Sequence, residues 1–117
     1  MAEVLDKYKQ VVRKNDLKII RQNLISQNNL NEVKKGMRQT VLSGTARLLS
    51  DLPVAVAAKT GTAQIGKNQL PHAWVTVFAP YDNPEIAMVV MVEHAGEGAT
   101  VAVPITNEIL KWYFSRK

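Results

Sequence analysis

Residues 53–64 read PVAVAAKTGTAQ, residues 71–80 read PHAWVTVFAP, and residues 84–93 read PEIAMVVMVE. Each stretch opens with proline and is rich in residues that favour β-structure, which predicts strands at about 54–64, 73–80 and 85–93. The connection between the last two stretches is too short for a crossover helix, so we expect the strands to pair antiparallel. The third strand is apolar at every position, which predicts a covering layer on both of its faces.

Two amphipathic segments flank these strands. Before them, apolar residues recur at helical spacing, namely Leu30, Val33, Met37 and Val41. They predict a helix over about residues 30–43, with a cap at Asn29 and an end at Gly44. After them, the same spacing is shown by Val101, Ile105, Ile109 and Trp112. This stripe predicts a second helix over about residues 101–114 that faces the core and is capped by Thr100.

The chain is predicted to be one α+β unit over residues 1–117 with a three-stranded antiparallel sheet as its core. Two short β-prone runs at residues 8–13 and 17–21 precede the first helix, and the turn-forming pair Asn15-Asp16 lies between them. They predict an N-terminal hairpin.

Composition excludes several classes of protein. The 117 residues carry 15 basic and 10 acidic side chains, and 46% are hydrophobic, which indicates a globular domain rather than a disordered chain. The longest apolar run is far too short to span a membrane, no targeting segment is visible, and there is no cysteine. The basic excess lies in residues 1–58, where Tyr8 is the only aromatic residue. We interpret it as a solvated face and expect no nucleic-acid partner.

The sequence contains no pattern that indicates a metal or cofactor site. The two histidines, His72 and His94, have neither a carboxylate nor a second histidine at metal-ligand spacing. Ordinary surface or edge positions are the simpler interpretation of both residues. We therefore predict no metal and no cofactor.

The tetrapeptide Lys59-Thr60-Gly61-Thr62 has more chemical content. A lysine ammonium can hold a carboxylate, and the two hydroxyls can add hydrogen bonds to it. A glycine within a strand allows a ligand to approach the backbone closely. Together these residues suit a strand edge that receives an extended anionic peptide. Four residues also fit a solvated lysine on an ordinary strand, and alone they favour that interpretation.

The wider sequence resembles class B penicillin-binding proteins, and most of all the elongation-type penicillin-binding protein 2. Lys-Thr-Gly is one of three motifs shared by serine transpeptidases and β-lactamases. The likeness is carried by residues 33–41, Gly44-Thr45-Ala46, residues 57–64, the hairpin at 72–84 and the loop Gly96-Glu97-Gly98-Ala99. It covers about residues 26–116, whereas residues 3–25 fit loosely.

The resemblance implies a partial penicillin-binding, β-lactamase-like transpeptidase fold. Its members cross-link the peptidoglycan of the bacterial cell wall, which maintains cell shape, by acyl transfer through a serine ester that β-lactams also form. By resemblance, Lys59 would line the site, Thr60 and Thr62 would bind the terminal carboxylate of the stem peptide, and Gly61 would let the substrate approach. The backbone N–H of Thr62 would be an oxyanion-hole donor. The parent protein would sit in the bacterial inner membrane with this domain in the periplasm.

The nucleophile of that family is missing. None of the four serines has lysine three residues further on, so there is no Ser-x-x-Lys motif. Ser26-Gln27-Asn28 matches the second motif, Ser-x-Asn, but Ser26 is better explained as a helix start. We therefore expect a C-terminal piece of a transpeptidase domain. Alone it would be inactive and would self-associate through surface that the N-terminal part of the domain covers.

Three alternatives remain open. In the first, the chain is a stand-alone, non-catalytic module that binds stem peptides or a cell-wall partner through residues 59–62. In the second, it is related to β-lactamases and penicillin sensors, which share Lys-Thr-Gly. In the third, it is a generic basic scaffold. Peptide binding that depends on Lys59 would favour the first, and salt-dependent nucleic-acid binding the last.

Overall fold

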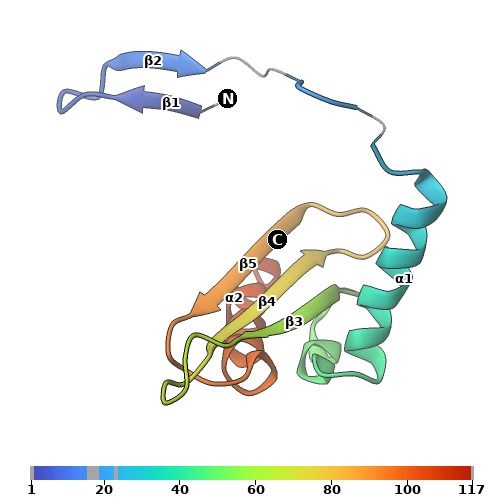
Figure 1. Ribbon diagram of the computed structural model, residues 1–117. Coiled ribbons are helices and arrows are strands. Elements are labelled where there is room, and N and C mark those ends of the chain that lie inside the picture. The colour runs from blue at the N-terminus through green and yellow to red at the C-terminus, as the bar shows by residue number, and fades with distance from the viewer. Residues whose placement is uncertain (1, 16–18, 23, 117) are drawn as a thin grey trace.

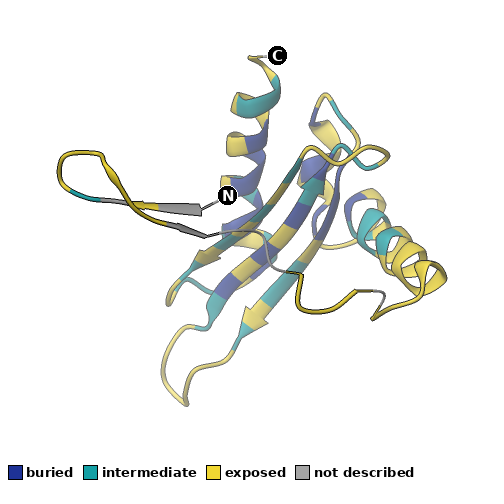
Figure 2. Cartoon of the chain, turned by 90° about the horizontal axis from the view of Figure 1, so that it is seen from above, coloured by how far each residue is buried: buried dark blue, intermediate teal, exposed yellow. Residues whose placement is uncertain are grey.

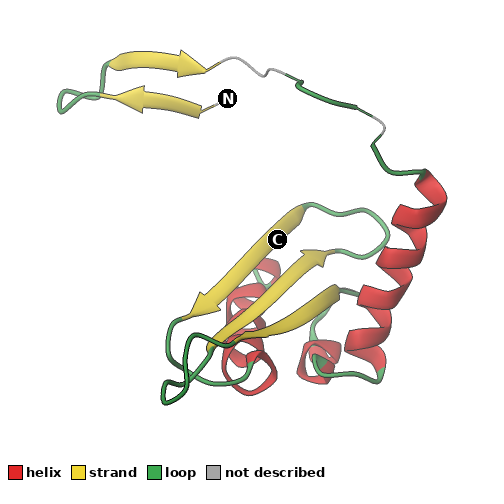
Figure 3. Ribbon diagram, in the orientation of Figure 1, coloured by secondary structure: helices red, strands yellow, loops and turns green. Residues whose placement is uncertain are grey.

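The computed structural model describes residues 2–15, 19–22 and 24–116 (Figure 1). The elements in chain order are β1 (Ala2–Leu5), β2 (Val11–Asn15), α1 (Gln27–Leu42), a 3-10 turn η1 (Arg47–Asp51), β3 (Ala57–Ala63), β4 (His72–Ala79), β5 (Ile86–Val92), a π-helical turn η2 (Gly98–Ala102) and α2 (Val103–Phe114). Figure 3 shows the main sheet with α2 behind it and α1 beside β3.

The predicted three-stranded sheet is confirmed. Its strand order is β3-β4-β5, and both pairs are antiparallel. The first strand starts at Ala57 rather than at residue 54. The backbone just before Ala57 forms its hydrogen bonds with groups outside the sheet. The Ala55 carbonyl accepts from the Tyr81 N–H at 2.7 Å, and the Val56 carbonyl accepts from the Arg38 side chain at 2.8 Å.

One face of the sheet forms the core. Alternate residues of β4 are buried, namely Ala73, Val75, Val77 and Ala79. They belong to the same cluster as Val41 of α1, Leu49 of η1 and Leu110 of α2, each at most 1% exposed. Figure 2 shows this buried row running along the middle strand. Each buried valine or leucine contributes roughly 1.5–3 kcal/mol, so this face holds the helices on the sheet.

The expectation that both faces of the third strand are covered is wrong for the described residues. Burial alternates along β5: Met88 and Val90 are half-buried, whereas Ala87, Val89 and Met91 are exposed. Val89 is 58% exposed. β5 is apolar on both of its faces, but only one of them is covered. α2 packs on that face of the sheet, and the other face of β5 is exposed to solvent.

The helix before the sheet begins at Gln27, three residues earlier than predicted. Its cap is Ser26, whose hydroxyl accepts the Asn29 N–H at 3.3 Å, so the predicted cap at Asn29 is wrong and the helix-start interpretation of Ser26 is confirmed. Gly44 follows the C-terminal cap residue Ser43, as predicted. A side chain there would meet the Thr40 Cα atom at 2.8 Å, which explains the glycine.

The second helix uses a different face from the predicted one. Its buried residues are Val103, Thr106, Asn107 and Leu110. Ile105, Ile109 and Trp112, which were expected to face the core, are 40%, 39% and 55% exposed. Thr106 can be buried because its hydroxyl donates to the Ala102 carbonyl at 2.8 Å. The predicted cap at Thr100 is also wrong, since that residue lies in η2, and α2 starts at Val103 with Pro104 in its first turn.

An N-terminal hairpin is present, but it is placed earlier than the β-prone runs suggested. β1 pairs with β2, and their turn lies at residues 6–10, whereas Asn15, which was expected in the turn, ends β2. The Asp6 carboxylate accepts the backbone N–H groups of Tyr8 and Gln10 at 2.8 and 2.9 Å, which builds the turn there. Asp16 and part of the second predicted run lie outside the described residues. The hairpin stands apart from the main sheet (Figure 1).

Candidate functional site

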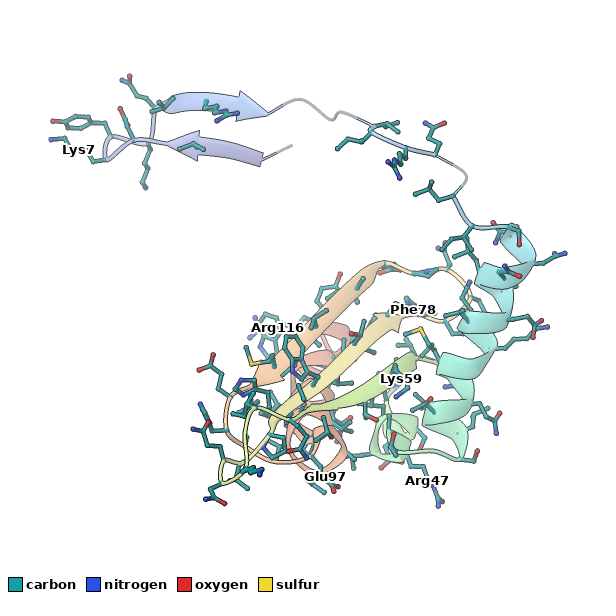
Figure 4. All side chains as sticks on the ribbon, in the orientation of Figure 1. Lys7, Arg47, Lys59, Phe78, Glu97 and Arg116 are labelled. Carbon is teal, nitrogen blue, oxygen red and sulfur yellow. The ribbon has the colours of Figure 1, made fainter. Side chains whose placement is uncertain are left out.

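Lys59, Thr60, Gly61 and Thr62 lie in the middle of β3, which is an edge strand. Among the described residues, β3 pairs with β4 alone, so its other edge has no partner strand. Lys59 and Thr62 are exposed, and Thr60 and Gly61 are half-buried. Figure 4 places Lys59 on β3 beside α1. The predicted site residues are therefore on one accessible strand. Because successive side chains of a strand point to opposite faces, these residues are divided between its two faces.

Lys59 carries a local hydrogen bond that locates the free edge. Its Nζ donates to the Thr60 carbonyl at 2.6 Å. In an antiparallel ladder a residue directs its N–H and C=O to the same side, and residues two apart point the same way. The N–H of Thr62 therefore points to the same edge as the Thr60 carbonyl.

The hydroxyl of Thr60 meets a residue from the turn after α1. The Oγ1 atoms of Thr45 and Thr60 are 2.6 Å apart, and either can be the donor. In the sequence, Thr45 stands out only as part of the Gly44-Thr45-Ala46 resemblance. Thr45 and Thr60 are 15 residues apart, with the turn η1 and the start of β3 between them. No periodic pattern in the sequence links residues at that distance, so the contact could not be predicted.

The strand is backed by the loop that precedes α2. Gly98 is buried, and a side chain on it would lie 2.5 Å from the Gly61 carbonyl oxygen and would also collide with the Trp74 carbonyl. The turn η2 contacts both β3 and β4. The backbone of Gly61 is therefore supported from behind, which restricts movement of the strand at the candidate site.

The two histidines, which were expected at ordinary surface or edge positions, contact each other. The His94 N–H donates to Nδ1 of His72 at 3.1 Å, and the ring centroids are 5.1 Å apart at an angle of 82°. His72 therefore has an unprotonated Nδ1, and its proton is on Nε2. This arrangement does not suit metal binding by His72. The lone pair of Nδ1 already accepts the His94 N–H, and Nε2 carries a proton and so has no free lone pair for a metal ion. Among the residues that the structure describes, no group of three or more His, Cys, Asp or Glu side chains is positioned to hold a metal ion.

A polar cavity of about 380 Å³ lies elsewhere, between the start of α1 and the turn after β4. It is lined by Asn28, Asn31, Glu32, Lys34, Lys35, Tyr81 and Asp82. Lys35 bonds Glu32 at 2.7 Å, and this hydrogen bond raises the pKa of the Lys35 ammonium. None of the lining residues comes from β3, so the cavity is separate from the Lys59–Thr62 edge.

Comparison with known proteins places the chain in a family. A family model described as the penicillin binding protein transpeptidase domain matches residues 3–111. Peptidoglycan D,D-transpeptidase MrdA of Haemophilus influenzae is 34% identical over 101 residues, which make up 72% of this chain and 16% of that protein. The likeness to transpeptidases thus includes the N-terminal hairpin, which the sequence resemblance had left as a loose fit.

Solved structures show the same fold. Penicillin-binding protein 2 of Pseudomonas aeruginosa in complex with WCK 5153 is 37% identical, with a TM-score of 0.68 over 78% of this chain and 20% of that one. Penicillin-binding protein A of Mycobacterium tuberculosis, solved as a ceftriaxone acyl-enzyme complex, has a TM-score of 0.70 over 93% of this chain and 26% of that one. At 22% identity, that second likeness shows the fold alone.

The sheet, its flanking helices and the Lys-Thr-Gly edge strand define part of the transpeptidase fold of peptidoglycan-synthesising enzymes. The chain belongs to the penicillin-binding protein transpeptidase family. It spans about one-sixth of the length of the curated relative MrdA. These similarities favour a relationship to transpeptidases over one to β-lactamases, and part of a transpeptidase domain over a stand-alone binding module. No described helix is both long and apolar enough to cross a membrane.

Proposed function

We propose that the chain forms the Lys-Thr-Gly wall of a peptidoglycan D,D-transpeptidase site, as the C-terminal piece of the transpeptidase domain. The observation that carries the proposal is the position of residues 59–62 on the free edge of β3. An extended peptide can lie along such an edge as an added strand. Relatives named as peptidoglycan D,D-transpeptidases support the choice of ligand.

Each residue of the wall has a proposed role. Lys59 attracts the terminal carboxylate of the stem peptide through its ammonium group, and Thr60 and Thr62 add hydroxyl hydrogen bonds. Gly61 keeps the face of the strand free of a side chain. The Thr62 N–H points to the free edge of the strand, which suits it to donate to the oxyanion that forms when the peptide carbonyl is attacked. β-Lactams, which carry a carboxylate and a reactive carbonyl, would use the same groups.

The chain does not supply the nucleophile in this proposal. Ser-x-x-Lys is absent from the 117 residues, and covalent acyl transfer needs an activated nucleophile. The N-terminal part of the domain would contribute it and would pack against this sheet. The whole protein would act outside the cytoplasmic membrane. Alone, the chain binds the peptide and does not turn it over.

We also propose that the isolated chain self-associates. β5 is an edge strand with seven consecutive apolar residues and no proline or charge within it. Soluble proteins ordinarily protect such edges with charge, proline or a covering element. Val89 and Met91 add exposed apolar surface beside this edge, at 58% and 40% exposure.

The experiment that tests the proposed function is a titration of the chain with a peptide ending in D-Ala-D-Ala, followed by backbone amide NMR. Saturable shifts confined to β3 and to the turn containing Thr45 are expected. Saturable shifts that cluster around the cavity at Tyr81, or no saturable shifts at all, would contradict it. A parallel titration with the same peptide ending in L-Ala-L-Ala controls for non-specific peptide binding.

A further inference from the structure

We infer that Thr45 is a positioning residue for the candidate site: its hydroxyl donates to Thr60 and thereby directs the Thr60 proton toward a bound carboxylate. The inference rests on the proposed function and adds a residue that its motif does not contain. It starts from the 2.6 Å contact between the two Oγ1 atoms.

The direction of this hydrogen bond decides what Thr60 can do. A threonine hydroxyl has one proton to donate and two lone pairs that accept. If Thr60 donates to Thr45, its proton is used and it cannot serve a carboxylate, which only accepts. If Thr45 donates to Thr60, the Thr60 proton is free for the ligand. A carboxylate at the edge of β3 therefore selects the arrangement in which Thr45 is the donor, and the two hydroxyls form a short chain that ends on the ligand.

The backbone that carries Thr45 is held in place. The N–H groups of Gly44 and Ala46 both donate to the Thr40 carbonyl at 3.1 Å. Ala46 is fully buried, and Gly44 packs so closely on Thr40 that a side chain would not fit. Thr45 lies between these two anchored residues and is itself exposed. Its hydroxyl therefore reaches Thr60 from a rigid turn rather than from a mobile loop, as orientation of a binding group requires.

The charge next to this pair matches the inferred ligand. The Lys59 ammonium bonds the backbone carbonyl of Thr60, the same residue whose hydroxyl Thr45 contacts. An anion attracted to Lys59 meets the hydroxyl that Thr45 has oriented. A purely structural role for Thr45, fastening the turn to β3, makes a different prediction, because it would affect acidic and neutral ligands alike.

The test compares the variants Thr45→Val and Thr45→Ser. Valine keeps the branched shape and removes the hydroxyl, whereas serine keeps the hydroxyl. Thr100→Val is the matched control, since the Thr100 hydroxyl bonds the Glu97 carbonyl of its own turn at 3.2 Å. The probes are diacetyl-L-Lys-D-Ala-D-Ala with a free carboxylate and the same peptide with a terminal carboxamide. Thermal unfolding of each variant checks that the fold is retained.

Thr45→Val is expected to weaken binding of the acid peptide about 3- to 10-fold and binding of the amide peptide less than about 2-fold, as loss of one hydrogen bond predicts. Thr45→Ser is expected to stay within about 2-fold of the wild type for both peptides. Equal weakening of both peptides, or no difference from Thr100→Val, would overturn the inference and leave the proposed function standing. Failure of the wild-type chain to bind either peptide would overturn the proposed function, and the inference with it.

Discussion

Gly98 lies against Gly61 with no space for a side chain between them, although 36 residues separate the two in the chain. A Cβ atom on Gly98 would lie 2.5 Å from the Gly61 carbonyl oxygen. One glycine belongs to the candidate ligand-binding strand and the other to the turn that leads into α2. The structure of the site therefore depends on a loop that carries none of its predicted binding residues.

The first prediction concerns this contact. Gly98→Ala forces the added methyl group against the backbone of β3 and β4, so either the turn or the strands must move. We expect a loss of about 1–3 kcal/mol in the free energy of unfolding, measured by urea denaturation. Gly36→Ala is the matched control, because Gly36 lies in α1 and has no neighbour within 4 Å of an added Cβ. That variant should gain roughly 0.5–1 kcal/mol. Equal stability of the two alanine variants would contradict the close contact.

The second prediction concerns the charge of the site. Lys59→Ala should weaken binding of a peptide with a free D-Ala-D-Ala carboxylate about tenfold or more, because a charge-assisted hydrogen bond is lost. Lys59 is exposed, so we expect the thermal unfolding midpoint to change little. Lys67→Ala removes another exposed lysine, in the connection between β3 and β4, and should bind as the wild type does. An equal effect of both variants would show that only net charge matters.

The third prediction concerns covalent chemistry. Incubation of the chain with benzylpenicillin should leave its intact mass unchanged, because no serine is followed by lysine at the third position. Mass spectrometry after removal of free drug makes the measurement. A stoichiometric gain equal to the mass of the drug would show that one of the serines is activated without that lysine.

The fourth prediction concerns the histidine pair. His72→Phe keeps an aromatic ring but removes the nitrogen that accepts the His94 N–H. The His94 amide should then exchange its hydrogen faster, by about 3- to 10-fold, in a deuterium-exchange experiment. His94→Asn is the control: it retains the backbone donor, and asparagine tolerates the positive φ of 51° at this position. Unchanged exchange in His72→Phe would mean that the bond does not protect this amide.

The fifth prediction concerns self-association. Val89→Lys places a charge on the exposed face of β5 and should reduce the average mass seen by light scattering at high concentration. Val33→Lys is the control, because Val33 on α1 is similarly exposed, at 60% against 58%. If both lysine variants reduce association equally, the added charge rather than the β5 surface is responsible. A monomeric wild type would contradict the proposed self-association.

The sequence predicted the three strands within a few residues, because their prolines, turns and β-branched residues are local signals. It placed Lys59 through Thr62 on a strand for the same reason, and the Lys-Thr-Gly context indicated the family. Two of the errors concern choices between two local solutions. Asn29 and Ser26 can both cap a helix, and the runs near Asn15-Asp16 compete with the turn built by Asp6.

The amino-acid sequence by itself determined which segments are helices and strands, since these depend on backbone preferences and on the spacing of apolar side chains. Only the tertiary structure decided which apolar face is buried. α2 carries one stripe through Ile109 and another through Leu110, and it is the second that packs into the core. The meetings of Thr45 with Thr60, His72 with His94 and Gly61 with Gly98 also appear only in three dimensions. Each depends on how distant segments pack, and such contacts leave no periodic trace along the chain.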